Sequence, residues 1–145
     1  MTLPFGVQDE SFLAAGGEDG IRALVEDFYR QMDALPEARE IRDMHPDDLE
    51  SSVDKLARFL CGWLGGPRRY NEKYGSISIP GVHRHLTIEE PERDVWLACM
   101  HRAVEKQPFA AEFKQYLLEQ LAIPAERIRQ ACAAERRERS GAQKP

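Results

Sequence analysis

The chain has 145 residues and a mass of 16.6 kDa, and its 20 basic and 25 acidic residues give a formal charge of −5. This length is enough for one globular domain whose core needs neither disulfides nor a structural metal. Three widely spaced cysteines indicate reduced core thiols, and a pI near 5.4 favours neither a nucleic-acid partner nor an anionic membrane surface.

No segment approaches the ~20 apolar residues of a membrane span. The longest stretch without Asp, Glu, Lys or Arg is residues 74–83. Residues 1–10 contain no basic segment followed by an apolar core, so we expect no secretory signal and a cytoplasmic protein.

The predicted elements in the first third of the chain are helices. Residues 11–15 form a short helix that Gly16 and Gly17 end, because glycine adopts the left-handed conformation common at helix ends. A long helix follows over residues 18–35, and Pro36 separates it from a short helix near residues 37–44. Apolar residues recur along the long helix at steps of three and four: Ile21, Leu24, Val25, Phe28, Tyr29 and Met32.

The next long helix begins near Asp47 and Asp48, which are candidate caps, and ends at Gly65. No helical period holds from there to Leu86, and the residues around Ile77 predict an extended loop or a weak edge strand. Loops this long inside a compact domain are usually disordered or functional. This one contains apolar residues, two histidines and four cations, which favours a function.

The last third is again helical, so the expected class is all-α. A capping box at residues 87–90 begins a helix that ends near Pro108. A final helix kinks or restarts at Pro124 and continues through Cys132. The expected organisation is an N-terminal extension, a folded domain and a charged, disordered tail, at residues 1–13, 14–134 and 135–145.

Four histidines are the main candidates for chemistry, since motifs of thiolate metal sites, zinc proteases, phosphate-binding loops and nucleophile elbows are absent from the sequence. We therefore assign no catalytic residue. None of these histidines forms the i, i+4 pair of a two-histidine zinc site; they are His45, His83, His85 and His101. One imidazole is nevertheless enough to hold haem iron, because the macrocycle supplies four further nitrogens.

A series of motifs runs through the chain in a fixed order. They are Gly16-Gly17, Phe28-Tyr29, His45-Pro46, residues 59–67 ending in Trp-Leu-Gly-Gly-Pro, then Tyr70, Gly75, His83 and residues 92–96. Together these motifs resemble a truncated haemoglobin of group II over about residues 14–132, without a gap from Gly65 through Trp96. The resemblance implies a two-over-two helical sandwich that encloses haem b (iron protoporphyrin IX).

The resemblance implies that His83 is the proximal ligand of the haem iron. His83 lies 18 residues after Gly65 and 13 residues before Trp96, and both intervals match the family. His85 stands where many relatives carry proline. Because side chains two residues apart diverge in a strand and in a helix, His83 and His85 cannot both face one iron.

On the opposite face, the resemblance implies that Tyr29 and Trp96 are the distal tyrosine and tryptophan that donate to a bound ligand. His45 can add a third donor, and Ser52 occupies the position where ordinary globins have a distal histidine. Without the resemblance, an aromatic residue on a helical stripe is more often simply core.

Residues 52, 55, 56 and 59 share one helix face that would line the haem pocket. Leu56 and Phe59 would then contact the porphyrin, and Tyr70 is a candidate for its edge. Candidate cations for the haem propionates are Lys55, Arg68, Arg69 and Arg84. A charge at any of these positions is more often simply a solvated surface residue.

The expected ligands are dioxygen, carbon monoxide, nitric oxide or peroxide. Several donors around dioxygen predict slow release, which suits chemistry or scavenging better than oxygen transport. An enzymatic alternative is a peroxidase or nitric oxide dioxygenase that draws electrons from an external reductase. A second alternative is a haem-free helical interaction module in which Tyr29, Leu56 and Trp96 are only core. Either a monomer or a homodimer is compatible with the sequence.

Overall fold

The computed structural model describes residues 4–142, and within this range all regular structure is helical. The predicted all-α class is therefore confirmed. In chain order the elements are α1 (Glu10–Ala14), α2 (Gly17–Ala34), the 3-10 turn η1 (Pro36–Ala38), α3 (Arg39–Asp43), α4 (Glu50–Trp63), α5 (Arg69–Tyr74), α6 (Ile79–His83), α7 (Glu90–Glu105) and α8 (Ala111–Ala142).

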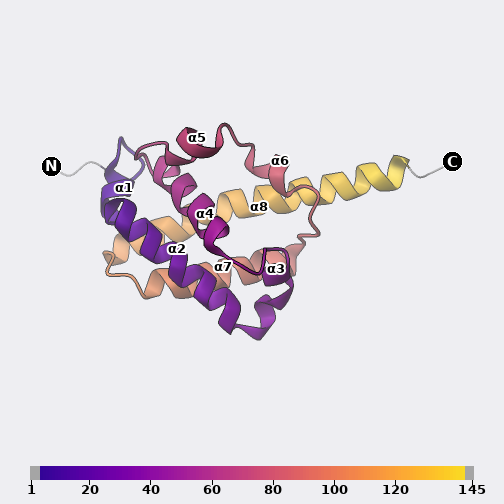
Figure 1. The fold of residues 1–145 in the computed structure, drawn as a ribbon, viewed down its shortest axis with the longest axis horizontal. Helices are drawn as coiled ribbons and strands as arrows, with labels where there is room; N and C mark the ends of the chain where they lie inside the picture. The colour runs from indigo at the N-terminus through magenta and orange to yellow at the C-terminus, as the bar shows by residue number, and fades with distance from the viewer. Residues whose placement is uncertain (1–3, 143–145) are drawn as a thin grey trace.

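Four long helices build the core. Helix α2 packs against both α4 and α7, and α7 packs against α8. Figure 1 shows α2 and α4 in front of α7 and α8, so that two helices lie across two others. Fully buried side chains come from α2, α4, α7 and α8, among them Phe28, Leu60, Met100 and Phe113.

Helix α2 forms as its apolar period predicts. All six residues of the predicted stripe, from Ile21 to Met32, are buried. Gly16 and Gly17 have φ values of 83° and 69°, a left-handed conformation that glycine adopts without strain. The predicted glycine boundary before this helix is thus confirmed.

The stretch between Gly65 and Leu86 differs from the expected extended loop or edge strand, because it contains α5 and α6. Helix α6 begins at Ile79 after Ser78, whose Oγ accepts a hydrogen bond from the Gly81 amide at 3.2 Å. Pro80 fits the first turn, where an N–H would have no partner in the helix. Both helices are too short for an apolar period to reveal them.

The capping box of α7 lies two residues later than predicted. Glu89 is the N-cap, and its amide donates to Glu92 Oε1 at 2.8 Å while its own side chain accepts from the Glu92 amide. Helix α7 therefore begins at Glu90, with Pro91 in the first turn. A box that starts at Thr87 is wrong, because the carboxylate of Glu89 serves as the cap.

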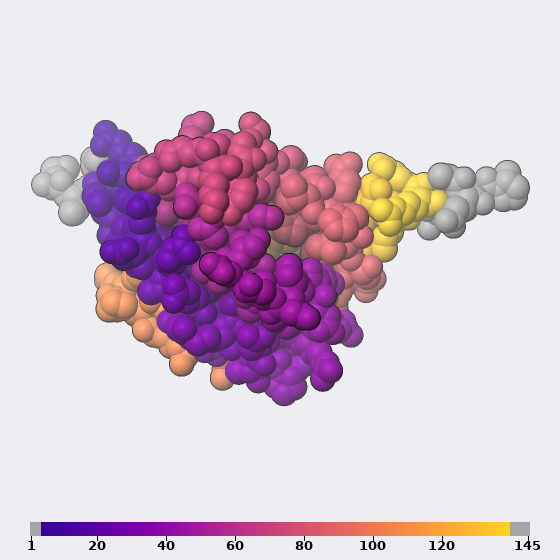
Figure 2. Space-filling model, viewed as in Figure 1, coloured from indigo at the N-terminus to yellow at the C-terminus, as the bar shows by residue number. Residues whose placement is uncertain are grey.

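Helix α8 passes through Pro124 without a break and continues to Ala142, where the sequence predicts disorder. The Glu135–Arg139 pair, 3.3 Å apart and one turn from each other, supports the helix in this stretch. Figures 1 and 2 show the last turns of α8 extending beyond the body of the molecule. The other residues of the predicted tail, 143–145, lie outside the described residues.

The start of the described chain packs on α8. The ring of Phe5 lies 5.3 Å from that of Phe113 and 5.2 Å from that of Tyr116. All three cysteines are buried and free, as predicted. Across residues 4–142, no helix combines the length and the apolar character that spanning a membrane requires.

Gly20 provides a test of how closely α1 and α2 meet. A Cβ at Gly20 would lie 1.9 Å from the carbonyl oxygen of Ala15, which is backbone and cannot move aside. We expect Gly20→Ala to lower the free energy of unfolding by about 1–3 kcal/mol or more, measured by denaturant titration with circular dichroism.

Gly62→Ala is the matched control, because its Cβ would come no closer than 3.4 Å to another group. Alanine is the better helix former, so this variant should be unchanged or more stable by up to about 1 kcal/mol. Equal losses in the two variants would contradict the close approach at Gly20.

Candidate functional site

His83 is the last residue of α6, and its ring is oriented by a hydrogen bond within that helix. Its Nδ1 lies 2.7 Å from the carbonyl oxygen of Ile79. A carbonyl only accepts, so Nδ1 carries a proton, and in the neutral ring Nε2 then has the lone pair. Nε2 takes part in no hydrogen bond with the described residues, which leaves it available to a metal.

The backbone of His83 is attached to α8 by a contact that the sequence analysis missed. The His83 carbonyl accepts from the Leu86 amide at 2.9 Å and from Cys132 Sγ at 3.1 Å. Cys132 is fully buried, so α8 holds α6 at the histidine. The sequence identified Cys132 only as a core thiol, since no local pattern links residues 49 positions apart.

The rings of Tyr29 and Trp96 both lie against that of Phe28, and His45 lies against Tyr29, although these residues come from three separate parts of the chain. The Phe28 ring lies 5.0 Å from that of Tyr29 and 5.1 Å from that of Trp96, while the Tyr29 and His45 rings are 5.5 Å apart. Burial raises the pKa of Tyr29 well above its ordinary value of 10.0. The phenol therefore keeps its proton and can donate it in a hydrogen bond.

His45 is held in the same way as His83, with Nδ1 at 2.8 Å from the carbonyl oxygen of Ile41. Burial lowers the pKa of His45 below 6.5, the hydrogen bond to Ile41 opposes this, and the charges of Arg42 and His83 lower the pKa further.

The predicted face of α4 carries half-buried side chains at Ser52, Leu56 and Phe59. Leu56 and Phe59 pack against the edge of the core without being enclosed by it. The Phe59 ring stands edge-on to that of Tyr70, with 6.5 Å between centroids. Leu56 and Phe59 therefore present a partly exposed apolar surface on α4.

The predicted cations divide into two groups. Lys55 Nζ lies over the Tyr74 ring, 5.6 Å from its centroid, and Arg69 pairs with Glu18 and Glu72. Arg68 and Arg84 are exposed, and neither forms an ion pair within the described part of the chain. His85 is exposed as well. Among the four predicted cations, Arg68 and Arg84 therefore have the fewest protein partners that would compete with a propionate.

Comparison with known proteins gives a consistent result. Residues 11–130 match the family model described as bacterial-like globin. The chain is 30% identical over 121 residues to the group 2 truncated hemoglobin YjbI of Bacillus subtilis (strain 168), an alignment that covers 83% of this chain and 89% of the relative.

Solved structures agree with this match. The group II 2-on-2 hemoglobin of Agrobacterium tumefaciens is 38% identical with a TM-score of 0.72, covering 79% of this chain and 92% of that one. The truncated oxygen-avid haemoglobin of Bacillus subtilis is 29% identical with a TM-score of 0.73, covering 81% and 97%. The expected two-over-two helical fold is confirmed.

The buried state of His45 predicts a pH dependence. We expect its imidazole to titrate below 6.5 in the protein without haem. The unfolded chain binds this proton more readily, so the stability that neutral His45 contributes is present above about pH 6.5 and is lost as the pH falls through the folded pKa. An NMR titration, with His45→Gln to assign the resonance, measures the pKa; a value at or above 6.5 would contradict the burial.

Proposed function

Since the chain belongs to the bacterial-like globin family, as a truncated haemoglobin of group II, we propose that it binds haem b through Nε2 of His83. Dioxygen or another diatomic ligand would then bind on the side of Tyr29 and Trp96. The observation that carries this proposal is the His83 ring, whose Nδ1 is occupied by Ile79 and whose Nε2 is left free. Metal-binding histidines usually have such an orienting partner.

The donor set fits haem. In the described residues, no three His, Cys, Asp or Glu side chains gather where they could hold a metal ion. A single imidazole suits a cofactor that brings its own four nitrogens. The half-buried Leu56, Phe59 and Trp96 offer apolar surface to a porphyrin. Arg68 and Arg84 are the cations best able to pair with its propionates, and Lys55 and Tyr70 are further candidates for contact with the haem edge.

When bound, the haem supplies an iron atom that takes the diatomic ligand. The chain supplies hydrogen-bond donors to that ligand, from the Tyr29 hydroxyl and the Trp96 indole. A hydrogen bond to a group with negative character contributes about 1.5–3 kcal/mol. Each donor should therefore slow the release of dioxygen about ten- to a hundredfold. Such retention suits scavenging or chemistry better than transport.

The sequence allows His45 to be a third hydrogen-bond donor to the ligand. In this proposal His45 is an acceptor instead. Nδ1 donates to Ile41, and the lowered pKa keeps the ring neutral near pH 7. Nε2 of His45 is then an acceptor, whose natural partner is a hydroxyl. We infer that His45 Nε2 accepts from the Tyr29 hydroxyl when no ligand is bound, the two rings being 5.5 Å apart between centroids, and that a bound ligand competes for this single proton. Ser52 is small and leaves room for ligand entry.

The iron ligand is tested by comparing two neighbouring histidines. The parent should purify with a Soret band that shifts on reduction and on addition of carbon monoxide. His83→Ala should lose this spectrum, because no other imidazole replaces Nε2. His85→Ala, an exposed control, should keep it. Loss in His85→Ala with retention in His83→Ala would reverse the assignment, and a colourless parent would favour the haem-free module.

The distal donors are tested by the rate of dioxygen release in stopped flow. Tyr29→Phe and Trp96→Leu should each release dioxygen about ten- to a hundredfold faster than the parent. Tyr116→Phe, which removes a hydroxyl from α8 beside Phe5 and away from the proposed site, is the control and should be unchanged. Parental rates in both distal variants would show that neither side chain holds the ligand.

A further inference from the structure

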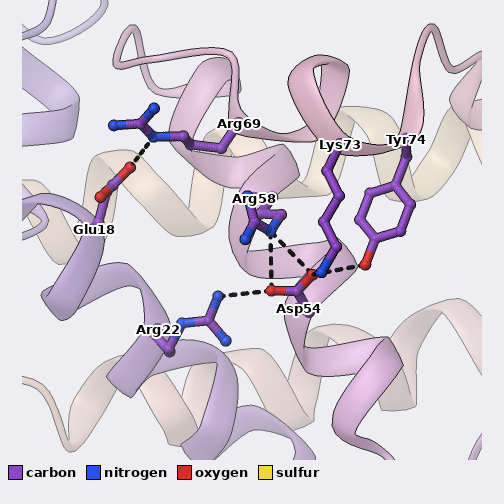
Figure 3. A network of polar contacts seen from close by, with 7 residues as sticks. All are labelled: Glu18, Arg22, Asp54, Arg58, Arg69, Lys73 and Tyr74. Carbon is purple, nitrogen blue, oxygen red and sulfur yellow. Dashed lines mark hydrogen bonds and ion pairs between the residues drawn. The ribbon is translucent and has the colours of Figure 1, made fainter.

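Asp54 on α4 is the centre of a polar network that joins three helices (Figure 3). Its carboxylate accepts from Arg22 of α2 at 3.0 Å and from Arg58, one turn along α4, at 3.0 Å. It also accepts from two residues of α5, Lys73 at 2.8 Å and the Tyr74 hydroxyl at 2.6 Å. One carboxylate that is 16% exposed thus binds four donors.

Helix α5 depends on this network, because it buries none of its residues. Six residues are far too few for a stable isolated helix. Its other contacts include the edge-on approach of Tyr70 to Phe59 and the pair between Arg69 and Glu18 on α2. Figure 3 shows both connections from α5, one to Glu18 and one to Asp54. Polar contacts rather than apolar burial therefore hold α5 in place.

The charges around Asp54 keep the network formed across the physiological pH range. The hydrogen bonds from Lys73 and Tyr74, opposed by burial and aided by Arg22 and Arg58, hold the pKa of Asp54 well below its ordinary value. The carboxylate is therefore ionised at neutral pH. Without its negative charge, three cations would face one another, and α5 would be repelled rather than held.

The position of α5 links this network to the proposed haem site. Residues 75–78 join α5 to α6, which ends at His83. On the other side, Tyr70 lies against Phe59, and Lys55 Nζ lies over the Tyr74 ring. Release of α5 would free both the residues expected at the haem edge and the segment leading to the proposed iron ligand.

We propose that Asp54 is a positioning residue that latches α5 against α2 and α4 and thereby slows the escape of haem. The haem part of this inference rests on the proposed function. The attachment of α5 does not, because every contact in the latch is within the protein.

Two measurements on the full chain test the latch. The first is hydrogen exchange of the α5 amides, which should be at least about tenfold faster in Asp54→Asn than in the parent. The second is the rate at which the holoprotein loses haem to an excess of a haem-binding acceptor protein, which should rise by a similar factor. Added salt should speed haem loss from the parent and have much less effect on Asp54→Asn, whose latch is already broken.

Matched variants separate the latch from general destabilisation. Asp27→Asn removes a carboxylate on α2 that also pairs with an arginine, Arg30, and it should leave α5 exchange and haem loss unchanged. Asp54→Glu keeps the charge and should restore most of the parental behaviour. Lys73→Gln removes one donor from an exposed position, so it cannot unfold the domain, and it should give an intermediate effect.

Parental exchange of α5 in Asp54→Asn and Lys73→Gln would overturn the latch. Faster exchange with unchanged haem loss would overturn its role in haem retention. A parent that takes up no haem would overturn the proposed function together with that role. The exchange rates would then still decide whether Asp54 holds α5.

Discussion

The proposed site depends on the hydrogen bond between Nδ1 of His83 and the carbonyl of Ile79. This bond sets the tautomer and the direction of the ring, so that the free lone pair of Nε2 has one orientation. It can do so only if the backbone of α6 is itself fixed. Ser78 caps the start of this five-residue helix, and Cys132 holds the carbonyl of His83 from α8. The ring is thus attached to one of the long core helices.

The molecule consists of two parts that are stabilised differently. The long helices are held together by buried apolar side chains, a non-directional contribution that scales with the area removed from water. Neither α5 nor α6 buries a residue, and polar contacts from α2, α4 and α8 hold them instead. These two short helices form one side of the proposed site, so a porphyrin would supply much of the apolar contact that they lack.

The sequence predicts the long helices well because each repeats its apolar period several times, as α2 does from Ile21 to Met32. It misses α5 and α6 because neither completes two full turns, and local propensity cannot identify so short a helix. The contacts of Asp54 with Lys73 and of Cys132 with His83 join distant residues, and no local pattern shows them. Only the i, i+4 spacing of Asp54 and Arg58 could have drawn attention to that carboxylate.

The two histidines near the proposed ligand position show how one local device can serve opposite roles. His45 and His83 each donate Nδ1–H to the carbonyl four residues earlier, so each presents Nε2 as an acceptor. Beside His45 stands the phenol of Tyr29, whose burial keeps it protonated, so a neutral acceptor here would compete with a bound ligand for the single phenol proton. His83 has no such donor among its aromatic contacts, and its lone pair remains available for a metal. The identity of the neighbouring group, rather than the histidine itself, separates a histidine placed to accept a hydrogen bond from one placed to bind a metal.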